Sequence, residues 1–167
     1  GLIDFVQADM LPRTHYMRKA SMANMADRLD NLEGMGGPFQ MMRNTMHINT
    51  GTDNFLEAAW LSNVADTEWT WAIRSADFDN DVLADLFFCN GVPRQFNHSD
   101  LPEINHANLV GKTHWDHYKV TPERREQNLA FHNRGDFRFD DASKKWGLDH
   151  LSMSYGASLS DLDGDGR

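Results

Sequence analysis

The amino-acid sequence predicts an all-β fold, namely a partial β-propeller of about two four-stranded blades that carry helical insertions. Three observations lead to this fold class. The chain repeats itself at a fixed interval, each repeat holds four short strand patterns, and each fourth strand runs into an acidic loop. We expect one propeller domain fragment over residues 1–167, with repeat units at about 1–81 and 82–165 and helical insertions at about 13–43 and 94–127.

The repeat is read from residues that recur in one register. The cluster Asp77, Asp79 and Asp81 returns 84 residues later, and the start of the chain matches the segment after that cluster at an offset of 81. Chance does not hold one register over so many positions. The matches at 84 include Asn44 with Asn128, Asn49 with Asn133, Gly51 with Gly135, Phe55 with Phe139, Ala58 with Ala142 and Trp71 with Tyr155; those at 81 include Leu2 with Leu83, Asp4 with Asp85 and Pro12 with Pro93.

Each repeat is predicted to contain four strands. The first is almost entirely apolar, which is typical of a strand buried on both faces. The second and third form a hairpin whose Asn/Gly/Asp turn supplies the positive φ of tight turns. The ranges in the two repeats are Leu2–Asp9 and Leu83–Asn90, Thr45–Asn49 and Leu129–Asn133, Asn54–Ala59 and Phe137–Asp141, and Thr70–Ala76 and Ser154–Ser160.

Two insertions, Arg13–Arg43 and Arg94–Gln127, separate the first strand of each repeat from the hairpin. In the first, apolar residues at helical spacing predict an amphipathic helix that ends at a Gly-rich stretch. In the second, Thr121 before Pro122 resembles a helix start, which predicts a brief helix reaching Gln127. The helical positions of the first insertion are Met17, Ser21, Met25, Leu29 and Leu32.

The acidic loop places carboxylates at alternate positions and one more four residues later. Calcium takes six to eight oxygen ligands, so four carboxylates, a backbone carbonyl from Leu83 and water nearly fill its shell. The ligands predicted for Ca²⁺ are therefore Asp77, Asp79, Asp81, Leu83 and Asp85, with Asp161, Asp163 and Asp165 starting a second loop and Asp4 ending another. Val82 stands where a glycine is expected, and a positive φ there would strain a β-branched side chain.

Composition limits the possible partners. The net charge of −9 repels phosphate backbones and anionic membranes, so we expect no nucleic acid as a partner. The sequence has no apolar run near the ~20 residues of a membrane helix, so we expect no membrane insertion. Cys89 is the only cysteine, which excludes an internal disulfide.

Two weaker patterns leave alternatives open. His98, His106, His114 and His117 could hold a transition metal, although ordinary surface histidines are the simpler interpretation. The tryptophans could form a platform for sugar rings, but the matched positions of Trp71 and Tyr155 favour a role in the blade core.

The motifs together resemble the FG-GAP/VCBS repeat proteins. The resemblance rests on Asp77-Phe78-Asp79-Asn80-Asp81, the hairpin pattern Asn-x-Gly-x-x-x-Phe, and Tyr155-Gly156-Ala157 ahead of Asp161. The segment Ala8 to Pro12 and the long insertions are similar to ASPIC/UnbV-associated proteins, relatives of cartilage acidic protein. This resemblance implies a propeller of about seven blades, calcium in its loops, and a secreted, periplasmic or cell-surface location.

The function expected from the resemblance is extracellular or cell-surface binding and adhesion, with a glycan or a surface protein as ligand and the remaining blades of a parent propeller as neighbours. We expect no enzyme activity from this segment. One alternative is part of a secreted polysaccharide-degrading enzyme with its site on the propeller face. Another is a purely structural calcium scaffold.

Overall fold

The computed structural model describes residues 2–21, 34, 36, 41–95, 97–101 and 110–164. Within these ranges the chain is mainly antiparallel β-structure, which confirms the β-rich character predicted from the sequence. The elements are β1 (Phe5–Gln7), β2 (Met10–Leu11), β3 (Thr45–Asn49), β4 (Phe55–Glu57), β5 (Glu68–Ala76), β6 (Asp85–Asn90), α2 (His114–Tyr118), β7 (Glu126–Gln127), β8 (Leu129–Asn133), β9 (Phe139–Asp141) and β10 (Leu151–Ser152).

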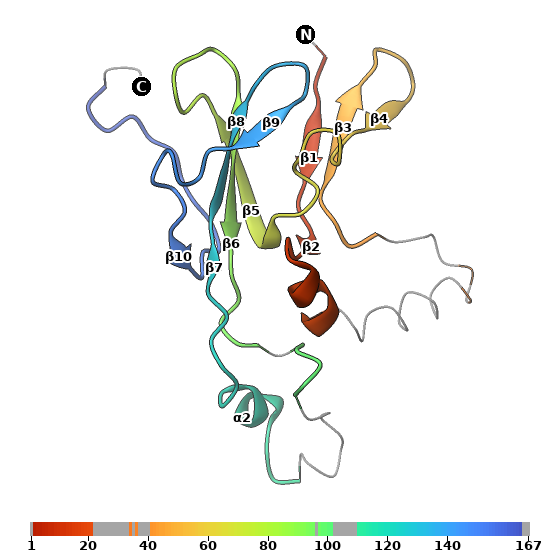
Figure 1. The fold of residues 1–167 in the computed structure, drawn as a ribbon, viewed down its shortest axis with the longest axis vertical. Helices are drawn as coiled ribbons and strands as arrows, with labels where there is room; N and C mark the ends of the chain where they lie inside the picture. The colour runs from red at the N-terminus through yellow and green to blue at the C-terminus, as the bar shows by residue number, and fades with distance from the viewer. Residues whose placement is uncertain are drawn as a thin grey trace.

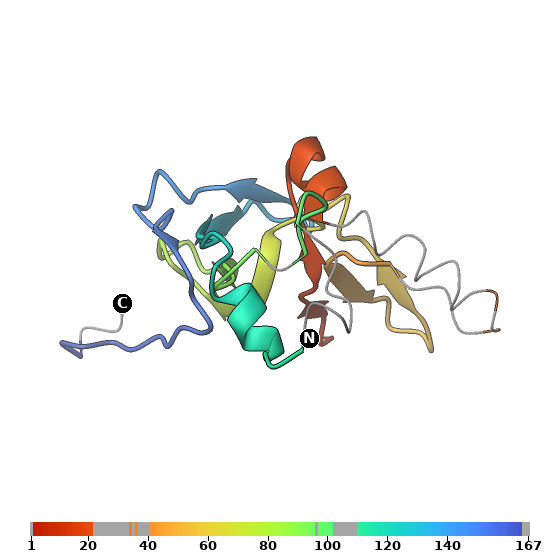
Figure 2. The same cartoon turned by 90° about the horizontal axis from the view of Figure 1, so that it is seen from below.

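The strands form two larger sheets and one small pair. One sheet has the order β2-β5-β6-β8-β9, a second has the order β1-β3-β4, and β10 pairs with β7. Figure 1 shows β1, β3 and β4 on one side of the central sheet and the C-terminal segment on the other. Figure 2, seen from below, shows the two larger sheets as separate layers.

Two three-stranded units have the same pairing register at the offsets read from the sequence. In β1-β3-β4, Phe5 faces His47 and His47 faces Glu57. In β6-β8-β9, Leu86 faces Phe131 and Phe131 faces Asp141. The six residue pairs of one unit correspond to the six of the other when 81 is added to the residue numbers of β1 and 84 to those of β3 and β4. The hairpin turns match too, because Gly51 and Gly135 have φ values of 74° and 79°.

A buried asparagine anchors each unit. The Oδ1 atom of Asn44 accepts the backbone N–H of Asp9 at 2.8 Å, and that of Asn128 accepts the N–H of Asn90 at 2.9 Å. Both amide groups also donate to the segment that follows the hairpin. A buried amide that is fully hydrogen-bonded fixes its surroundings, because leaving its partners unsatisfied costs about 1–3 kcal/mol.

The hydrophobic core lies between the two larger sheets. Phe88 and Phe131, on neighbouring strands, are 0% and 1% exposed and their rings meet edge to face at 5.5 Å. Met46 from β3 belongs to the same cluster, so both units contribute to one core. The other members are Ala59, Val64, Ala65, Leu86, Leu129 and Phe139, with Val6 and Ile73 packed against them.

The first strand of the first repeat and the fourth strand of the second repeat differ from their predictions. The strand predicted over Leu2–Asp9 is limited to Phe5–Gln7, and Phe5 is 45% exposed rather than buried on both faces. Its counterpart in β6 is buried as predicted, because β5 and β8 flank it. The strand predicted over Ser154–Ser160 is absent, and only Leu151–Ser152 form a strand there.

The helix predicted over residues 121–127 is also wrong. Arg124 instead pairs with Val92 in an isolated bridge, and Glu126–Gln127 form β7. Strand pairing therefore prevails over the helix-start signal of Pro122. A helix that the sequence analysis missed, α2, begins after Thr113, whose side chain accepts the N–H of Asp116 in a capping box.

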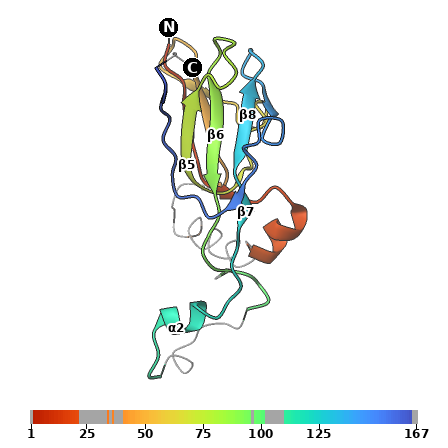
Figure 3. The same cartoon turned by 90° about the vertical axis from the view of Figure 1, so that its left-hand side faces the viewer.

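The first insertion is helical over residues 15–21, in agreement with the predicted helix at Met17 and Ser21. The predicted positions Met25, Leu29 and Leu32 lie outside the described residues. Figures 1 and 3 show this helix and α2 at one end of the sheets, whereas the hairpin turns and the loop between β5 and β6 lie at the other. We call these the insertion end and the turn end.

Candidate metal centre

The complete acidic loop, residues 77–84, connects β5 to β6 at the turn end. These strands pair with each other from Thr70 with Asn90 to Ala76 with Asp85. The loop is therefore a hairpin turn within the five-stranded sheet. In this sheet β5, the last strand of the first sequence repeat, pairs with β6, the first strand of the second repeat. An ion held there would fix the geometry of one hairpin.

The loop is folded by its own carboxylates. Asp77 accepts the backbone N–H groups of Asp81 at 3.1 Å and Val82 at 2.8 Å, and Asp81 accepts that of Leu83 at 2.8 Å. Asn80 and Val82 adopt positive φ values of 63° and 74°. Val82 thus adopts the left-handed φ that a glycine would take at this position, and its side chain is 91% exposed. This conformation costs a non-glycine residue on the order of 1–2 kcal/mol.

The carboxylates converge on one point of the loop. One oxygen each from Asp77, Asp79 and Asp85 lies within 4.8 Å of the others. Asp85 is 0% exposed, and its two oxygens accept the N–H groups of Phe78 at 2.9 Å and Asn133 at 2.8 Å. The buried carboxylate therefore connects the loop to the β8–β9 turn, and the more exposed carboxylates face it.

Backbone dipoles favour negative charge at the start of the loop. Burial acts to raise the pKa of Asp77, but the backbone N–H groups of residues 79–82 outweigh it and hold this pKa below its ordinary value. Hydrogen bonds to a charged carboxylate stabilise the charged form. Asp77 is thus prepared to act as an anionic ligand.

The structure adds His132, which the sequence analysis did not select. This β8 side chain is 16% exposed, and its Nδ1 atom lies 3.3 Å from Asp79 Oδ2 and 3.5 Å from Asp85 Oδ1. Asp79, Asp81 and His132 form a second group of potential ligands within 4.8 Å. No repeat signal could have found it, because the matching residue 84 positions earlier is Ile48.

The remaining predicted ligands are more scattered. Asp4 directly precedes β1 of the other unit and lies with Leu83 on the wall of a cavity of about 730 Å³ between the two sheets. Its Oδ1 atom accepts the N–H of Asn49 at 2.8 Å, as Asp85 does with Asn133. Asp161 accepts the N–H of Gly164 at 2.7 Å, in a bend that includes Asp163. Asp165 lies outside the described residues.

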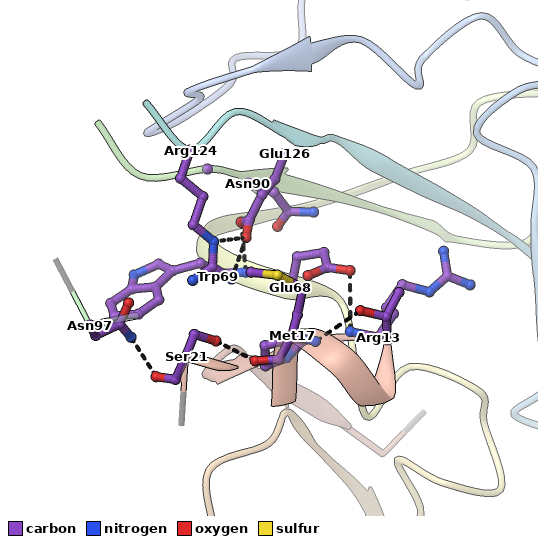
Figure 4. Close-up of polar contacts among 12 residues, drawn as sticks. Arg13, Met17, Ser21, Glu68, Trp69, Asn90, Asn97, Arg124 and Glu126 are labelled. Carbon is purple, nitrogen blue, oxygen red and sulfur yellow. Dashed lines mark hydrogen bonds and ion pairs between the residues drawn. The ribbon is translucent and has the colours of Figure 1, made fainter. Parts of the chain in front are cut away.

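A second charged cluster occupies the insertion end (Figure 4). Arg124 and Glu126 are 4% and 8% exposed, and Arg124 Nε donates to Glu126 Oε1 at 2.7 Å. The other Glu126 oxygen accepts the backbone N–H of Trp69 at 3.0 Å. Glu68 has a φ of 73° and accepts the N–H of Arg13 at 3.2 Å. These contacts join β7 and the first insertion to the start of β5, so the cluster acts as a structural joint.

Burial raises the pKa of Glu68, and the nearby negative charge of Glu126 adds to that effect while Arg13 and Arg124 oppose it. Glu68 and Glu126 lie on the wall of a cavity of about 410 Å³. A carboxylate with a raised pKa in a cavity is a common feature of functional sites, but ion-pair networks produce the same effect. The contacts of this cluster account for its burial.

The histidine and tryptophan patterns have different outcomes. Among the described residues, the groups that bring three potential metal ligands together include neither His98, His114 nor His117. His106 lies outside the described residues. Trp71 and Tyr155 are 47% and 55% exposed with ring centroids 5.2 Å apart, so their assignment to the blade core is wrong.

No helix among the described residues has the length and apolar character needed to cross a membrane. The chain matches no family model, no curated protein and no solved structure.

Proposed function

We propose that this chain is a calcium-binding segment of a β-propeller that acts in extracellular or cell-surface binding. The observation that carries the proposal is the hairpin loop between β5 and β6. There Asp77, Asp79 and Asp85 bring carboxylate oxygens within 4.8 Å of one another, and Asp81 adds a fourth carboxylate. Calcium favours such oxygen-rich loops, whereas magnesium prefers to keep its waters.

Electrostatics supports an ion at this place. Like charges at ~4 Å cost on the order of 4 kcal/mol per pair near a protein surface, and a divalent cation removes that repulsion. Loops of moderate affinity fill at the ~10⁻³ M calcium found outside cells. We therefore place the protein in the secreted, periplasmic or cell-surface class.

The two three-stranded units support the propeller assignment. They share one pairing register and pack face to face through a common core, as neighbouring blades do. A ring needs more blades than the two units described here. The propeller proposal therefore includes further sheets beside these.

The ligand that we favour is a glycan. Trp71 and Tyr155 form an exposed aromatic pair, and the indole N–H of Trp71 donates to the Gly91 carbonyl, which fixes the orientation of its ring. Fixed aromatic faces suit the apolar faces of sugar rings, and they lose little side-chain entropy on binding. The proposal is binding rather than catalysis.

Thermal melting with calcium and with a chelator tests the metal site. At a calcium concentration of about 100 times the Kd, binding adds about 2.7 kcal/mol of stability, a rise in Tm of about 5–10 °C for a chain of this size. Asp79→Asn should abolish most of this rise. The matched control is Asp140→Asn, which removes a carboxylate whose side chain is 70% exposed and lies on β9.

Three outcomes would change the assignment. A melting curve that calcium leaves unchanged removes the calcium site. A rise that appears only with zinc or manganese would assign the site to a transition metal held through His132. Equal loss in Asp79→Asn and Asp140→Asn would show that calcium binds by general charge attraction.

A further inference from the structure

We infer that the cavity of about 410 Å³ at the insertion end binds an amino sugar, with the ammonium group of the sugar against Glu68. This adds a ligand site to the proposed glycan-binding role and rests on that role for the sugar character of the ligand. The charge of the ligand is argued from the cavity itself.

The cavity has the size and the composition of a sugar site. Its volume lies within the ~300–1,000 Å³ that is usual for small-molecule sites. Apolar side chains of the wall suit the apolar face of a pyranose ring, and planar amide and guanidinium groups hydrogen-bond to its hydroxyls. The apolar residues are Met17, Leu129 and Leu151, and the planar polar ones include Gln95, Arg125 and Gln127.

One carboxylate of the wall has no counter-charge. Among the described residues, Glu68 makes no ion pair, and only its Oε1 atom accepts a hydrogen bond, from the N–H of Arg13 at 3.2 Å. Each arginine of the wall, in contrast, already has a carboxylate close to it. The pairs are Arg13 with Asp141 at 2.8 Å, Arg124 with Glu126 at 2.7 Å and Arg125 with Glu123 at 3.0 Å. The uncompensated charge is therefore negative, and the ligand group that matches it is a cation.

The surroundings of Glu68 favour a cationic partner. Burial and the charge of Glu126 raise the pKa of Glu68. Both effects disfavour the charged carboxylate, and a nearby ammonium opposes them because an opposite charge favours ionisation. A charge-assisted hydrogen bond is about twice as strong as one between neutral groups. A sugar with an ammonium group therefore gains more from this wall than the same sugar with a hydroxyl.

A buried hydrogen-bond donor of the same wall has no acceptor. Arg124 is 4% exposed, and its Nε and Nη2 atoms both lie 2.7 Å from Glu126 Oε1. Only Nε has the geometry of a hydrogen bond, so Nη2 is a buried donor without a hydrogen-bond partner in the described part of the chain. Buried donors are almost always paired, and a sugar hydroxyl oxygen would accept here. Figure 4 shows Arg124, Glu126 and Glu68 together at the start of β5.

The repeated frame of the fold does not require these side chains. At the offset of 84 residues, Glu68 corresponds to Ser152 and Glu126 to Met42. Glu68 also has a φ of 73°, and strained conformations of this kind gather at functional sites. Charged residues that belong to one unit only, one of them under strain, indicate a role in binding.

Three small probes test the inference on the full chain. Glucosamine, N-acetylglucosamine and glucose share one ring and differ at a single position, and at about pH 6 only glucosamine carries an ammonium group. The titrations are followed by NMR of the methyl groups of Met17 and Leu129 on the cavity wall. We expect glucosamine to bind at least ~10-fold more tightly than either neutral sugar.

Glu68→Gln keeps the size of the side chain and its acceptor oxygen but removes its charge. The preference for glucosamine should then fall to within ~2-fold of the neutral sugars. Asp100→Asn is the matched control and should keep the preference, because it removes a charge from a side chain that is 85% exposed and is not on the cavity wall. Thermal melting checks that both variants are folded.

A second measurement needs no variant. Nuclear Overhauser contacts between the ring protons of glucosamine and the methyl groups of Met17 and Leu129 are expected in the natural chain. Their absence at saturating glucosamine would overturn the inference.

The affinities give further ways to overturn it. Equal affinity for glucosamine and glucose would do so, as would a preference that survives in Glu68→Gln. An equal loss of preference in Asp100→Asn would show attraction by the net charge of −9 instead of the cavity. Butylamine that binds as tightly as glucosamine would overturn the assignment to a sugar.

Cellohexaose, a neutral glycan, separates this inference from the proposed function. If Trp71→Ala lowers the binding of cellohexaose while glucosamine does not bind, the cavity inference fails and glycan binding stands. If glucosamine binds in the cavity while cellohexaose does not bind, the cavity inference stands and the aromatic platform fails.

Discussion

The two three-stranded units have the same strand pairing but very different burial. Leu86 on β6 is 5% exposed, whereas Phe5, its counterpart on β1, is 45% exposed. In the exposed unit Phe5 stacks on His47 at 4.4 Å and meets Phe55 edge to face at 5.2 Å. The comparison shows that local pattern and turn chemistry set the register, whereas the number of neighbouring strands sets the burial.

The largest expected effect is a difference in stability loss when matched side chains of the two units are removed. Phe131→Ala should lower the free energy of unfolding by about 3–5 kcal/mol, because this side chain is 1% exposed and leaves a cavity. Its counterpart, His47→Ala, should cost less than about 1 kcal/mol because that ring is only half-buried. Urea denaturation followed by circular dichroism measures both. Similar losses would show that the units are equally buried in solution.

The second-largest effect concerns the buried asparagine that the two units share. Asn44→Ala and Asn128→Ala should each lower stability by about 2–3 kcal/mol, because both amides are buried and leave several partners unsatisfied. The exposed Asn54→Ala is a control that should change stability by less than about 0.5 kcal/mol. The two large losses are to be compared by the same urea denaturation. A large loss at only one asparagine would contradict their equivalence.

The smallest effect concerns the matched acidic residues Glu57 and Asp141. The hydrogen bond from Arg43, opposed by burial and aided by backbone N–H groups, lowers the pKa of Glu57 from 4.5 to about 2. Burial acts to raise the pKa of Asp141, but bonds from Ser143 and Arg13 outweigh it and hold this pKa below its ordinary value. A folded-state pKa below the unfolded one stabilises the protein above the unfolded value, and this stability is lost as pH falls.

Glu57→Gln should therefore cost less than about 1 kcal/mol at neutral pH, since the ion pair is partly exposed to solvent. Its stability should also decline less than that of the natural chain between pH 4.5 and pH 2. Urea midpoints across this range measure the difference. Parallel curves for the two proteins would exclude Glu57 as a source of acid sensitivity.

Much of the fold could be predicted from the sequence because local signals and the repeat agree. The hairpins at Asn49-Thr50-Gly51 and Asn133-Arg134-Gly135 form where predicted, and both asparagines accept the N–H of the following glycine. The strand of residues 85–90 is buried as its apolar pattern indicates. Repetition also located the carboxylates that converge in the loop.

Other features depend on neighbours that no local pattern reveals. His132 approaches the loop from β8, and its counterpart Ile48 carries no polar signal. The exposure of Phe5 follows from the absence of a second flanking strand among the described residues. Pairing of Arg124 with Val92 overrides the helix signal at Pro122. The capping residues of α2, Thr113 and Asp116, stand three positions apart in the sequence and are the local signal for this helix.

The repeat offsets in the sequence could locate the strands but could not show which consecutive strands share a sheet. A pattern that repeats every 84 residues does not reveal at which of its four strands a sheet begins. The pairing of β5 with β6 decides this, because it puts the acidic loop inside a sheet.

Both insertions leave the sheets at the end opposite the acidic loop (Figure 1). The cost of closing a loop rises by only about 0.6 kcal/mol for each doubling of its length. Sequence can therefore be lengthened, shortened or exchanged there without disturbing the strands or the carboxylates. For a protein engineer this end is a grafting site for foreign peptides, and for natural selection it is where new specificities can arise on an unchanged frame.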